Sequence, residues 1–391
     1  MRFFDVQSSG FSELIFLKEG FHMEVCEQKR TYMELAIELA KKGIGAVNPN
    51  PLVGAVIVKE DRIIGQGYHA RYGDLHAERS AFANLTEDAT GAAMYVTLEP
   101  CCHFGKQPPC TQAIVEHGIR KVYVGSDDPN EKVAGKGIEY LRAHGVEVET
   151  HVMKEACDAI NAIFFHYITT KTPYVIMKYA MTMDGKIAAY TGESKWITSE
   201  QSRQAVQQTR NACMGIMVGS ETVLADNPAL TCRIPGGRNP IRIVCDGRLR
   251  IPLDCGLVQT AKDIATIVAT ISADKEKIRV LEQLGVEVMV CPEKDGHVDL
   301  CELMKRLGEK GIDSILLEGG GTLNESAMKA GIIQEVHAYI APKMLGGSQA
   351  KTPVEGMGYD HPDRAARFCL LESRIVGEDI LLRYAAVNAR A

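Results

Sequence analysis

Histidine, glutamate and cysteine residues in one stretch of the chain have the types and spacing of a catalytic metal site. His76 precedes Glu78 by two residues, and Cys101 and Cys110 each directly follow a proline. A neutral imidazole and two thiolates suit Zn²⁺, and three protein ligands leave the fourth position to water, as in catalytic zinc sites. We expect Cys110 to begin a helix, whose N-terminus favours the thiolate. The pattern therefore predicts a zinc site formed by His76, Cys101 and Cys110.

Glu78 is the carboxylate that could move protons at this site. Residues two apart do not share a helix face, so His76 must lie at the very start of a helix if Glu78 is to reach the water. A glutamate placed there can accept a proton from the water and deliver it to a departing amine. His-x-Glu with paired cysteines is the signature of zinc nucleobase deaminases, and we predict that Glu78 is catalytic.

Neighbouring residues offer competing metal ligands. Cys102 or His103 could replace Cys101, but only Cys101 directly follows Pro100, as the deaminase signature requires. We therefore expect Cys102 to be a packed thiol and His103 to be a loop residue that orders the site. Ordinary core cysteines are the remaining alternative, although His-x-Glu and two Pro-Cys steps rarely coincide by chance.

Alternating helix and strand signals surround the motif. A helical pattern from Tyr32 is followed by two β-rich runs that predict a hairpin, and helices and strands then alternate to the end. The polar segment 169–173 ends in a proline and breaks this pattern, so we place the domain boundary there. The predicted parts are an N-terminal extension (1–22), a first α/β domain (23–168), a linker (169–173) and a second α/β domain (174–391).

The sequence at each end of the chain leads to a separate prediction. The final run, Asp379–Tyr384, has the pattern of an edge strand. Residues 1–22 show no clear pattern. We expect them to be either a disordered extension or an artefact of start-site choice, with Met23 as the true start.

Composition narrows the classes of function. The 391 residues are 46% hydrophobic and 24% charged, which is the balance of a globular protein with two sizeable cores. With 50 acidic and 44 basic side chains, the net charge of −6 argues against a main role in holding nucleic acid. Twelve cysteines are too few for a disulfide scaffold, and we find neither a signal-peptide pattern nor a membrane-spanning run. We expect a cytoplasmic protein without nucleic-acid or membrane partners.

The spacing of the two cysteines distinguishes classes of deaminase. Two residues separate them in cytidine and transfer-RNA adenosine deaminases, whereas the eight residues CHFGKQPP separate them here. With NPNPLVG at 48–54, GYH at 67–69 and DDPN at 127–130, the chain resembles the RibD family of bifunctional riboflavin-biosynthesis proteins over about residues 26–388. A nucleic-acid-editing deaminase would need the short spacing and a basic groove, and it would leave the second domain unexplained.

The resemblance implies a cytidine-deaminase-like, three-layer first domain. Its reaction would be hydrolysis of the 2-amino group of 2,5-diamino-6-ribosylamino-4(3H)-pyrimidinone 5′-phosphate, with one zinc ion per chain and proton shuttling by Glu78. A pyrimidine edge needs amide and imidazole partners, and a ribose phosphate needs a cation. Asn50 between two prolines could instead be a turn former, and Lys106 an exposed loop charge. The implied substrate contacts are Asn50, His69, Lys106, Asp128 and Asn130.

Three pieces of the second half carry a further resemblance: MTMDGK at 181–186, GESKWIT at 192–198 and EGGGTL at 318–323. The last lies between a predicted strand and a predicted helix, where glycines let backbone N–H groups approach a phosphate. A glycine triplet alone is more often a tight turn, and it is not the G-x-G-x-x-G of a Rossmann fold. Together the pieces resemble the reductase half of the family. This implies a dihydrofolate-reductase-like α/β domain that uses NADPH to reduce the ribosyl side chain to ribityl.

The reductase resemblance also implies cofactor contacts. Trp196 would lie beside the nicotinamide, unless it only packs in a core. Lys178 or Asp184, on or just after the first strand of the domain, could assist proton transfer. The implied NADPH contacts are Ala180, Trp196, Thr222, Asp226, Gly247, Gly320, Gly321, Thr322, Leu323, Asn324, Glu325 and Ser326.

A second implied set binds the substrate of the reductase. Arg210 and Arg233 suit its phosphate because guanidinium groups bind phosphate bidentately, although either one could be an ordinary surface charge. The implied contacts are Ser194, Arg210, Leu230, Arg233 and Glu318.

We therefore predict a two-domain enzyme that deaminates and then reduces pyrimidine ribose phosphates. By resemblance it is a homo-oligomer, either a dimer or a tetramer. A zinc-stabilised module that holds a nucleotide without turning it over is the alternative outside enzymes, but it would not need Glu78. A variant with one inactive domain is a further alternative, although no motif residue is missing.

Overall fold

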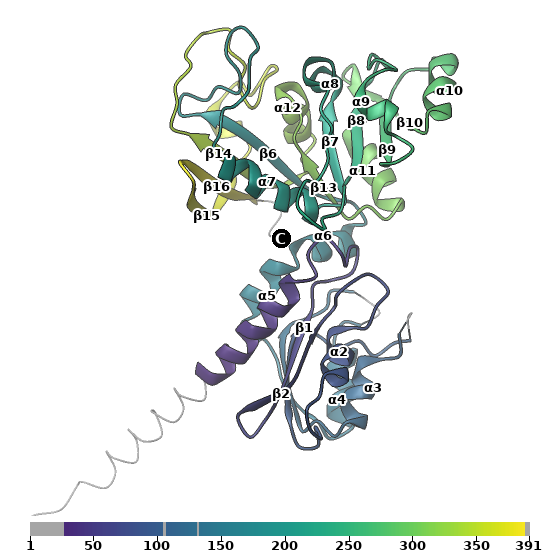
Figure 1. The fold of residues 1–391 in the computed structure, drawn as a ribbon, viewed down its shortest axis with the longest axis vertical. Helices are drawn as coiled ribbons and strands as arrows, with labels where there is room; N and C mark the ends of the chain where they lie inside the picture. The colour runs from purple at the N-terminus through teal and green to yellow at the C-terminus, as the bar shows by residue number, and fades with distance from the viewer. Residues whose placement is uncertain (1–26, 105–106, 131–132, 388–391) are drawn as a thin grey trace, which may run out of the picture. The chain divides into compact units, whose positions relative to one another are not determined.

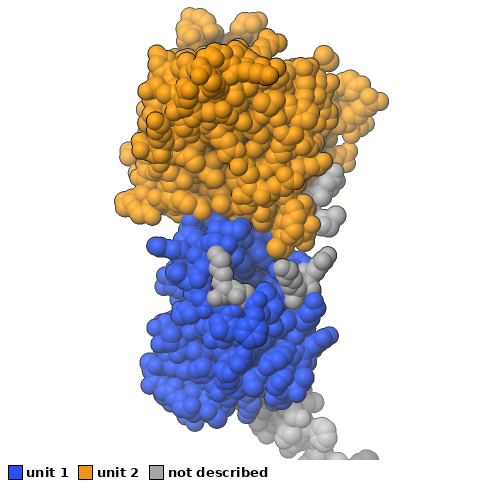
Figure 2. Space-filling view, turned by 90° about the vertical axis from the view of Figure 1, so that its right-hand side faces the viewer, with its two compact units in different colours: residues 1–165 blue, residues 166–391 orange. Residues whose placement is uncertain are grey.

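The structure of the chain is a computed structural model that describes residues 27–104, 107–130 and 133–387. The predicted extension 1–22 and the predicted phosphate ligand Lys106 lie outside these residues. The chain divides into two compact units, residues 1–165 and 166–391 (Figures 1 and 2). The division falls within helix α6 (Ala162–Thr170), so the predicted linker 169–173 begins inside a helix. Among the described residues, no helix combines the length and the apolar character needed to cross a membrane.

Unit 1 is built around a five-stranded sheet with the order β2-β1-β3-β4-β5. β1 pairs antiparallel with β2 and β3, and the other neighbours are parallel. The β1–β2 pair is the hairpin that the sequence predicts. The strands are β1 (Gly54–Lys59), β2 (Arg62–Tyr68), β3 (Ala93–Leu98), β4 (Lys121–Ser126) and β5 (Glu147–Glu149).

Helices cover both faces of this sheet, which gives unit 1 three layers (Figure 1). Successive strand residues point to opposite faces, so Ile57 of β1 packs in the core beneath α2, α3 and α4, together with Phe82. Val56 packs in the other core with Met33 of the first helix, described over residues 27–41, and with α5. The predicted three-layer fold is confirmed. The helices are α2 (Ala77–Ala83), α3 (Cys110–Glu116), α4 (Lys136–Ala143) and α5 (Lys154–Ile160).

Unit 2 contains a nine-stranded sheet with the order β10-β9-β8-β7-β13-β6-β14-β16-β15. The strands from β10 to β14 are parallel, and β16 and β15 continue the sheet antiparallel. The parallel strands bring their carboxyl ends to one edge of the sheet, where ligands of open α/β folds bind. The strands are β6 (Tyr174–Thr182), β7 (Gly215–Gly219), β8 (Ile241–Cys245), β9 (Thr266–Thr270), β10 (Glu287–Val290), β13 (Ser314–Leu317), β14 (Ile333–Ala341), β15 (Phe368–Val376) and β16 (Asp379–Ala386).

Two helical layers cover this sheet as well. The core on one face joins Met177, Ile315 and Leu303, so α11 and α12 lie on that side. α8, α9 and α10 pack on the opposite face, and Val206 of α7 contacts this face through Tyr339. The remaining elements are α7 (Glu200–Ala212), α8 (Ser220–Asp226), α9 (Gly256–Gln259), α10 (Lys275–Gln283), α11 (Leu300–Glu309), α12 (Gly321–Lys329), a 3₁₀ turn (Pro362–Arg364) and the small hairpin β11 (Glu293–Lys294) and β12 (His297–Val298).

The C-terminal strand prediction needs a correction. The run 379–384 forms β16, but β16 lies between β14 and β15, and the edge strand is β15. The sequence pattern missed β15 because apolar and polar residues do not alternate along this strand. Three of its apolar side chains are exposed: Leu370, Leu371 and Ile375.

Candidate metal centre and reductase site

The three predicted zinc ligands meet in unit 1. His76 is the N-cap residue of α2, Cys110 begins α3, and Cys101 follows the end of β3. Their ligand atoms all lie within 4.8 Å of one another. His76 Nδ1 lies 3.5 Å from Cys101 Sγ and 3.4 Å from Cys110 Sγ. Tetrahedral zinc with ordinary bond lengths separates a nitrogen and a sulfur ligand by about 3.6 Å, so the donor set and its spacing fit Zn²⁺.

The competing ligands are not part of this cluster. Among the described residues, the only group of three or more His, Cys, Asp or Glu side chains close enough to hold a metal is His76, Cys101 and Cys110. Cys102 is a free thiol that does not belong to this group. The Nδ1 atom of His103 is buried and has no hydrogen-bond partner among the residues that the structure describes.

Hydrogen bonds at the site favour a thiolate on Cys101. The Cys110 thiol bonds the Cys101 sulfur and lowers the pKa of Cys101, with smaller contributions from His76 and from the Cys110 backbone. The Cys110 backbone N–H donates to Cys101 Sγ over 3.4 Å. This amide belongs to the first turn of α3, where N–H groups have no partner within the helix.

Glu78 lies beside these ligands. It is the second residue of α2 and is 3% exposed. Burial raises the pKa of Glu78. His76 has extended backbone angles (φ −67°, ψ 161°) as the N-cap, so it occupies the start of the helix as the sequence analysis requires. A buried carboxyl group with a raised pKa suits both acceptance and donation of a proton near neutral pH.

Arg79, which the sequence analysis did not select, joins two segments of the metal site. Its Nε donates to Pro108 O over 3.1 Å, and its Nη2 donates to Pro109 O over 3.0 Å. The helix that carries His76 is thereby tied to the two residues directly before Cys110. No sequence motif identifies this role because it depends on a contact between segments about 30 residues apart.

Four of the five predicted deaminase substrate contacts lie within the described residues. Asn50 Nδ2 lies 3.1 Å from His69 Nε2, and the His69 ring packs edge-on against His76 with centroids 5.6 Å apart. Burial lowers the pKa of His69, which favours a neutral ring. Asp128 accepts the backbone N–H of Asn130 over 2.8 Å, and burial raises the pKa of Asp128 to about 6. The negative charges of Glu99 and Cys101 contribute to this increase.

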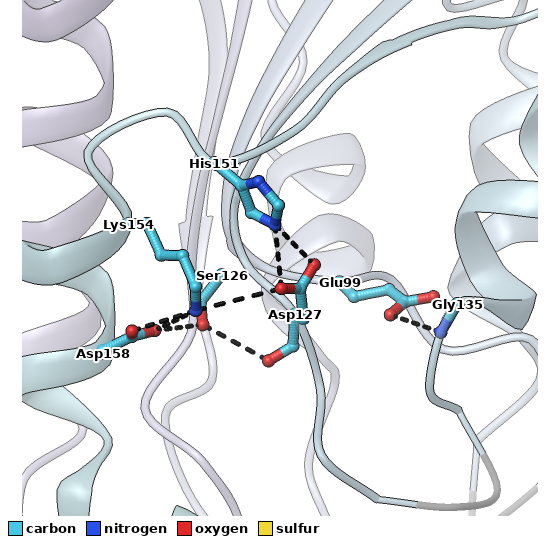
Figure 3. Close-up of polar contacts among 7 residues, drawn as sticks. All are labelled: Glu99, Ser126, Asp127, Gly135, His151, Lys154 and Asp158. Atoms are coloured by element: carbon cyan, nitrogen blue, oxygen red, sulfur yellow. Dashed lines mark hydrogen bonds and ion pairs between the residues drawn. The ribbon is translucent and has the colours of Figure 1, made fainter. Parts of the chain in front are cut away.

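A polar network anchors the loop that carries Asp128 (Figure 3). His151 Nε2 lies 2.8 and 3.0 Å from the two carboxylate oxygens of Asp127. Lys154 Nζ lies 3.8 Å from Asp127 and 2.9 Å from Asp158, which also accepts from the Ser126 hydroxyl. These contacts attach the end of β4 to the start of α5. The loop 127–130 begins at this end of β4.

Glu99 anchors the other side of the same region. Glu99 is 4% exposed, and its carboxylate accepts the backbone N–H of Gly135 over 2.9 Å (Figure 3). The same carboxylate accepts the backbone N–H of Gly137, also over 2.9 Å. The start of α4 is thereby fixed to the residue two positions before Cys101. Gly137 is required there, because a Cβ atom at this position would lie 2.1 Å from Pro100 O.

Unit 2 has a cavity of about 240 Å³ at the carboxyl ends of its strands. It lies where β7, β8 and β13 end and where α8 and α12 begin. The cavity is also lined by the polar residues Ser220, Arg250, His297, Lys351 and Glu355. No sequence motif identifies them, because they come from separate segments of the chain. The predicted cofactor contacts that line the cavity are Thr222, Gly247, Gly320, Gly321, Thr322, Leu323 and Ser326.

The glycine triplet shapes this cavity. A Cβ atom on Gly321 would lie 2.4 Å from Glu355 Cγ, so only glycine fits without movement of that side chain. A Cβ on Gly320 would meet only Thr222 Oγ1, at 3.7 Å. The N-terminus of α12 lies at the cavity, where the helix dipole favours an anion, and the Glu355 side chain packs beside Gly321.

Five predicted cofactor contacts do not line the cavity: Ala180, Trp196, Asp226, Asn324 and Glu325. Asn324 and Glu325 are buried and hold a neighbouring segment. Asn324 Nδ2 donates to Pro353 O over 2.8 Å, and Glu325 accepts from Gly358 N over 3.4 Å. Ala180 lies on β6, at the same edge of the sheet as the cavity. Trp196 is 60% exposed, so the alternative that it packs in a core is wrong.

The predicted reductase substrate residues form a buried charged group. Arg210 Nε and Nη2 donate to the two oxygens of Glu318 over 2.8 and 2.9 Å, and Lys178 Nζ lies 3.9 Å from Glu318. Burial by itself would raise the pKa of Glu318, but the charges of Lys178 and Arg210 lower it to about 2. The positive charge of Arg233, an exposed side chain, contributes to the same decrease. The guanidinium of Arg210 is therefore held by Glu318, whereas the side chain of Arg233 is exposed.

The other residues of this set differ in setting. Leu230 is 4% exposed and adopts a left-handed backbone conformation (φ 51°), whereas Ser194 is half-buried in the loop before α7. Asp184 accepts the backbone N–H of Gly346 over 2.6 Å. The Thr182 hydroxyl and this N–H lower the pKa of Asp184 to about 2. Asp184 therefore holds the loop at 345–346, and Lys178 is the candidate that contacts the charged group.

Comparison with known proteins places both units in one family. The model of the cytidine and deoxycytidylate deaminase zinc-binding region matches residues 26–126, and that of the RibD C-terminal domain matches residues 173–382. The chain is 56% identical to the riboflavin biosynthesis protein RibD of Actinobacillus pleuropneumoniae over 357 residues, which cover 91% of this chain and 95% of that protein. It is 38% identical to the Escherichia coli RibD, with coverage of 91% and 98%.

Solved structures agree with this assignment. The Acinetobacter baumannii RibD (form 1) superposes with a TM-score of 0.83 at 36% identity, over 93% of this chain and 99% of that one. A Thermotoga maritima diaminohydroxyphosphoribosylaminopyrimidine deaminase/5-amino-6-(5-phosphoribosylamino)uracil reductase superposes with a TM-score of 0.82 at 36% identity, over 92% and 99%. The chain therefore belongs to the RibD family and is a bifunctional deaminase and reductase of riboflavin biosynthesis.

Proposed function

We propose that the deaminase unit binds one zinc ion through His76, Cys101 and Cys110 and that Glu78 carries protons there. The observation that supports this most is the convergence of three ligand atoms within 4.8 Å beside a glutamate that is 3% exposed. Bound zinc would supply a Lewis acid that makes a water molecule reactive near neutral pH. Glu78 would accept a proton from the attacking water at its carboxylate and donate it to the departing amino group.

The proposed substrate of this unit is 2,5-diamino-6-ribosylamino-4(3H)-pyrimidinone 5′-phosphate. Asn50 and His69, which contact each other beside His76, would hold the pyrimidine edge through amide and imidazole groups. Asp128 and Asn130 would contact the substrate from the loop after β4, and Lys106 would bind its phosphate.

The test of the proton carrier is Glu78→Gln in the full-length protein. Glutamine keeps the shape and cannot carry the proton, so we expect zinc content to stay unchanged while ammonia release falls by about 10²- to 10⁴-fold. NADPH oxidation with substrate that is already deaminated should persist. Glu139→Gln, an exposed glutamate on α4, is the matched control and should retain ammonia release. Undiminished ammonia release in Glu78→Gln would refute the role of Glu78.

We further propose that unit 2 binds NADPH along the carboxyl edge of its sheet. The pyrophosphate would lie at Gly320 and Gly321, and the nicotinamide would lie toward Ala180 and Trp196. The cofactor would also contact Thr222, Asp226, Gly247 and the first residues of α12. Bound NADPH would supply the hydride that reduces C1′ of the ring-opened ribosyl group. The chain's task would be orientation and exclusion of water.

The substrate of the reductase would bind between Ser194, Leu230 and the charged group formed by Lys178, Arg210 and Glu318, with Arg233 on its phosphate. Arg233→Ala should therefore raise the KM for this substrate by about 10-fold or more, because a charged hydrogen bond to phosphate is lost. The KM for NADPH should stay unchanged. Equal substrate KM values for the variant and the wild type would contradict the assignment.

We also propose that the protein is a cytoplasmic homo-oligomer, either a dimer or a tetramer. The support for self-association is the edge strand β15, where Leu370, Leu371 and Ile375 are exposed together with Ile380 of β16. Clustered apolar side chains of this kind usually mark a protein interface. Light scattering after size exclusion tests the proposal, and Ile375→Glu should shift the wild-type oligomer toward the monomer. A monomeric wild type would refute it.

A further inference from the structure

Trp196 is an unusual side chain in this protein. It is the single tryptophan among 391 residues, and it is 60% exposed. Tryptophan side chains are strongly buried on average, so an indole with this exposure is uncommon. The indole therefore offers an uncovered flat surface, which is useful only if the ring is held in one orientation.

Arg203 supplies that restraint. Its guanidinium carbon lies 4.5 Å from the centroid of the Trp196 ring, the geometry of a cation–π contact. The same guanidinium donates from Nη1 to Thr198 O over 2.7 Å. One side chain thus covers part of the indole and fixes the backbone two residues further along the same loop.

The position of Arg203 is itself fixed by a buried carboxylate. Asp379, 1% exposed at the start of β16, accepts from the backbone N–H of Ser199 over 2.8 Å and from the hydroxyl groups of Ser199 and Ser202 over 2.7 and 2.5 Å. Ser199 is the N-cap of α7, and its side chain accepts the N–H of Ser202. The first turn of α7, which carries Arg203, is therefore attached to the sheet.

The backbone of Trp196 is held from another side. Lys343 Nζ donates to Trp196 O over 2.9 Å. Lys343 lies two residues after β14, whose last residue, Ala341, pairs with Thr182 at the end of β6. Trp196 therefore lies at the carboxyl edge of the parallel strands, the same edge at which the cavity opens.

We propose that Arg203 is a positioning residue for the reductase. It holds one face of Trp196 so that the indole forms a fixed surface for a planar cofactor ring, the nicotinamide of NADPH. The inference rests on the proposed function, in which NADPH binds at this edge with its nicotinamide beside Trp196. Fixing the ring before binding removes the cost of ordering it on binding, so loss of Arg203 weakens cofactor binding without removing any cofactor contact.

The experiment uses the single tryptophan as its own reporter. Full-length wild type, Arg203→Met and Arg203→Lys are compared, with Arg279→Met as the control. Arg279 is an exposed arginine of α10 that pairs with Glu276 over 2.7 Å. Steady-state anisotropy and acrylamide quenching of tryptophan emission are measured without cofactor, and the Kd for NADPH is measured by energy transfer from the tryptophan to the bound dihydronicotinamide.

We expect Arg203→Met to lower the anisotropy, to increase the quenching and to raise the Kd for NADPH by about 3- to 10-fold, the range of a partly exposed cation–π contact. Arg203→Lys keeps the charge and loses the planar group, so it should fall between wild type and Arg203→Met. Arg279→Met should match the wild type. Unchanged circular dichroism shows that each variant is folded, and Arg203→Lys carries the test if Arg203→Met is not.

Two failures are distinguishable. If NADPH causes no energy transfer in the wild type, the proposed cofactor site is wrong. If the wild type binds NADPH but both Arg203 variants show wild-type anisotropy, quenching and Kd, the cofactor site stands and the role of Arg203 is refuted.

Discussion

The buried ion pair between Arg210 and Glu318 should contribute measurably to the stability of unit 2. Glu318→Gln keeps the size of the side chain and removes its charge. The pKa of Glu318 is about 2 in the folded protein, against an ordinary value of 4.5. This difference corresponds to about 3 kcal/mol of stability at neutral pH. The side chains of Glu318 and Arg210 are only 11% and 14% exposed, so solvent screening reduces the value little. Removal of one partner of a buried pair typically costs a similar amount, about 3–5 kcal/mol.

The pH dependence gives the prediction a sign. Because the pKa of Glu318 is lower in the folded state, its contribution is complete above the unfolded value of 4.5 and is lost as the pH falls toward 2. The difference between wild type and Glu318→Gln should therefore narrow from about 3 kcal/mol at pH 7 to about 2 kcal/mol at pH 3.5.

Urea unfolding of the full-length protein, followed by the emission of Trp196, measures this difference because the only tryptophan lies in unit 2. Glu276→Gln is the matched control. Glu276 pairs with Arg279, but the two side chains are 71% and 62% exposed, so its loss should change the free energy of unfolding by less than about 0.5 kcal/mol. Equal stability of Glu318→Gln and wild type at pH 7, or a difference that does not shrink at pH 3.5, would refute the reasoning.

Three further predictions concern the metal and cofactor sites. Arg79→Met removes two hydrogen bonds to the segment before Cys110, so the affinity for zinc, measured by competition with a chelator, should fall by about 10- to 100-fold. Arg142 is an exposed arginine of α4, and Arg142→Met should behave as wild type. Equal zinc retention in both variants would contradict the role of Arg79. Gly321→Ala should raise the KM for NADPH because its Cβ would lie 2.4 Å from Glu355 Cγ, and Glu355→Ala in the same chain should restore the KM; failure of this rescue would show that the clash is not the cause. Removal of zinc by a chelator should abolish ammonia release and leave NADPH oxidation with pre-deaminated substrate intact, and a parallel loss of both activities would count against a zinc role confined to unit 1.

Local chemistry made part of the metal site predictable from sequence. His-x-Glu and the two Pro-Cys steps are short motifs, and each places its residues at the end of a secondary-structure element. His76 is the N-cap of α2 and Cys110 begins α3, so the backbone alone orients both ligands. The glycines at 319–321 were predictable for the same reason, since a strand, a glycine turn and a helix follow one another directly.

Contacts between distant segments were not predictable. Arg210 has the sequence features of a phosphate ligand, and nothing near it in the chain indicates that Glu318, 108 residues away, occupies its guanidinium. Glu99 and Arg79 form hydrogen bonds with backbone groups of other segments. Because nearly every residue carries these backbone groups, the residue types do not indicate which of them are bonded. β15 was missed because apolar and polar residues do not alternate along it, and its exposed residues include both kinds.

The two units position their ligand-binding residues in different ways. In unit 1 the reacting group needs ligands at fixed separations, and the structure ties three segments together with Arg79, Glu99 and the network around Asp127. In unit 2 the proposed cofactor is long, and the structure offers one edge of a parallel sheet, with the glycine turn at 319–321 in one place and the indole of Trp196 held by Arg203 in another. Substitutions that loosen a tie in unit 1 should therefore act on metal retention, whereas those along the edge in unit 2 should act on the KM for NADPH. Because the residues of each set lie in only one unit, the two groups of substitutions should be additive in their effects.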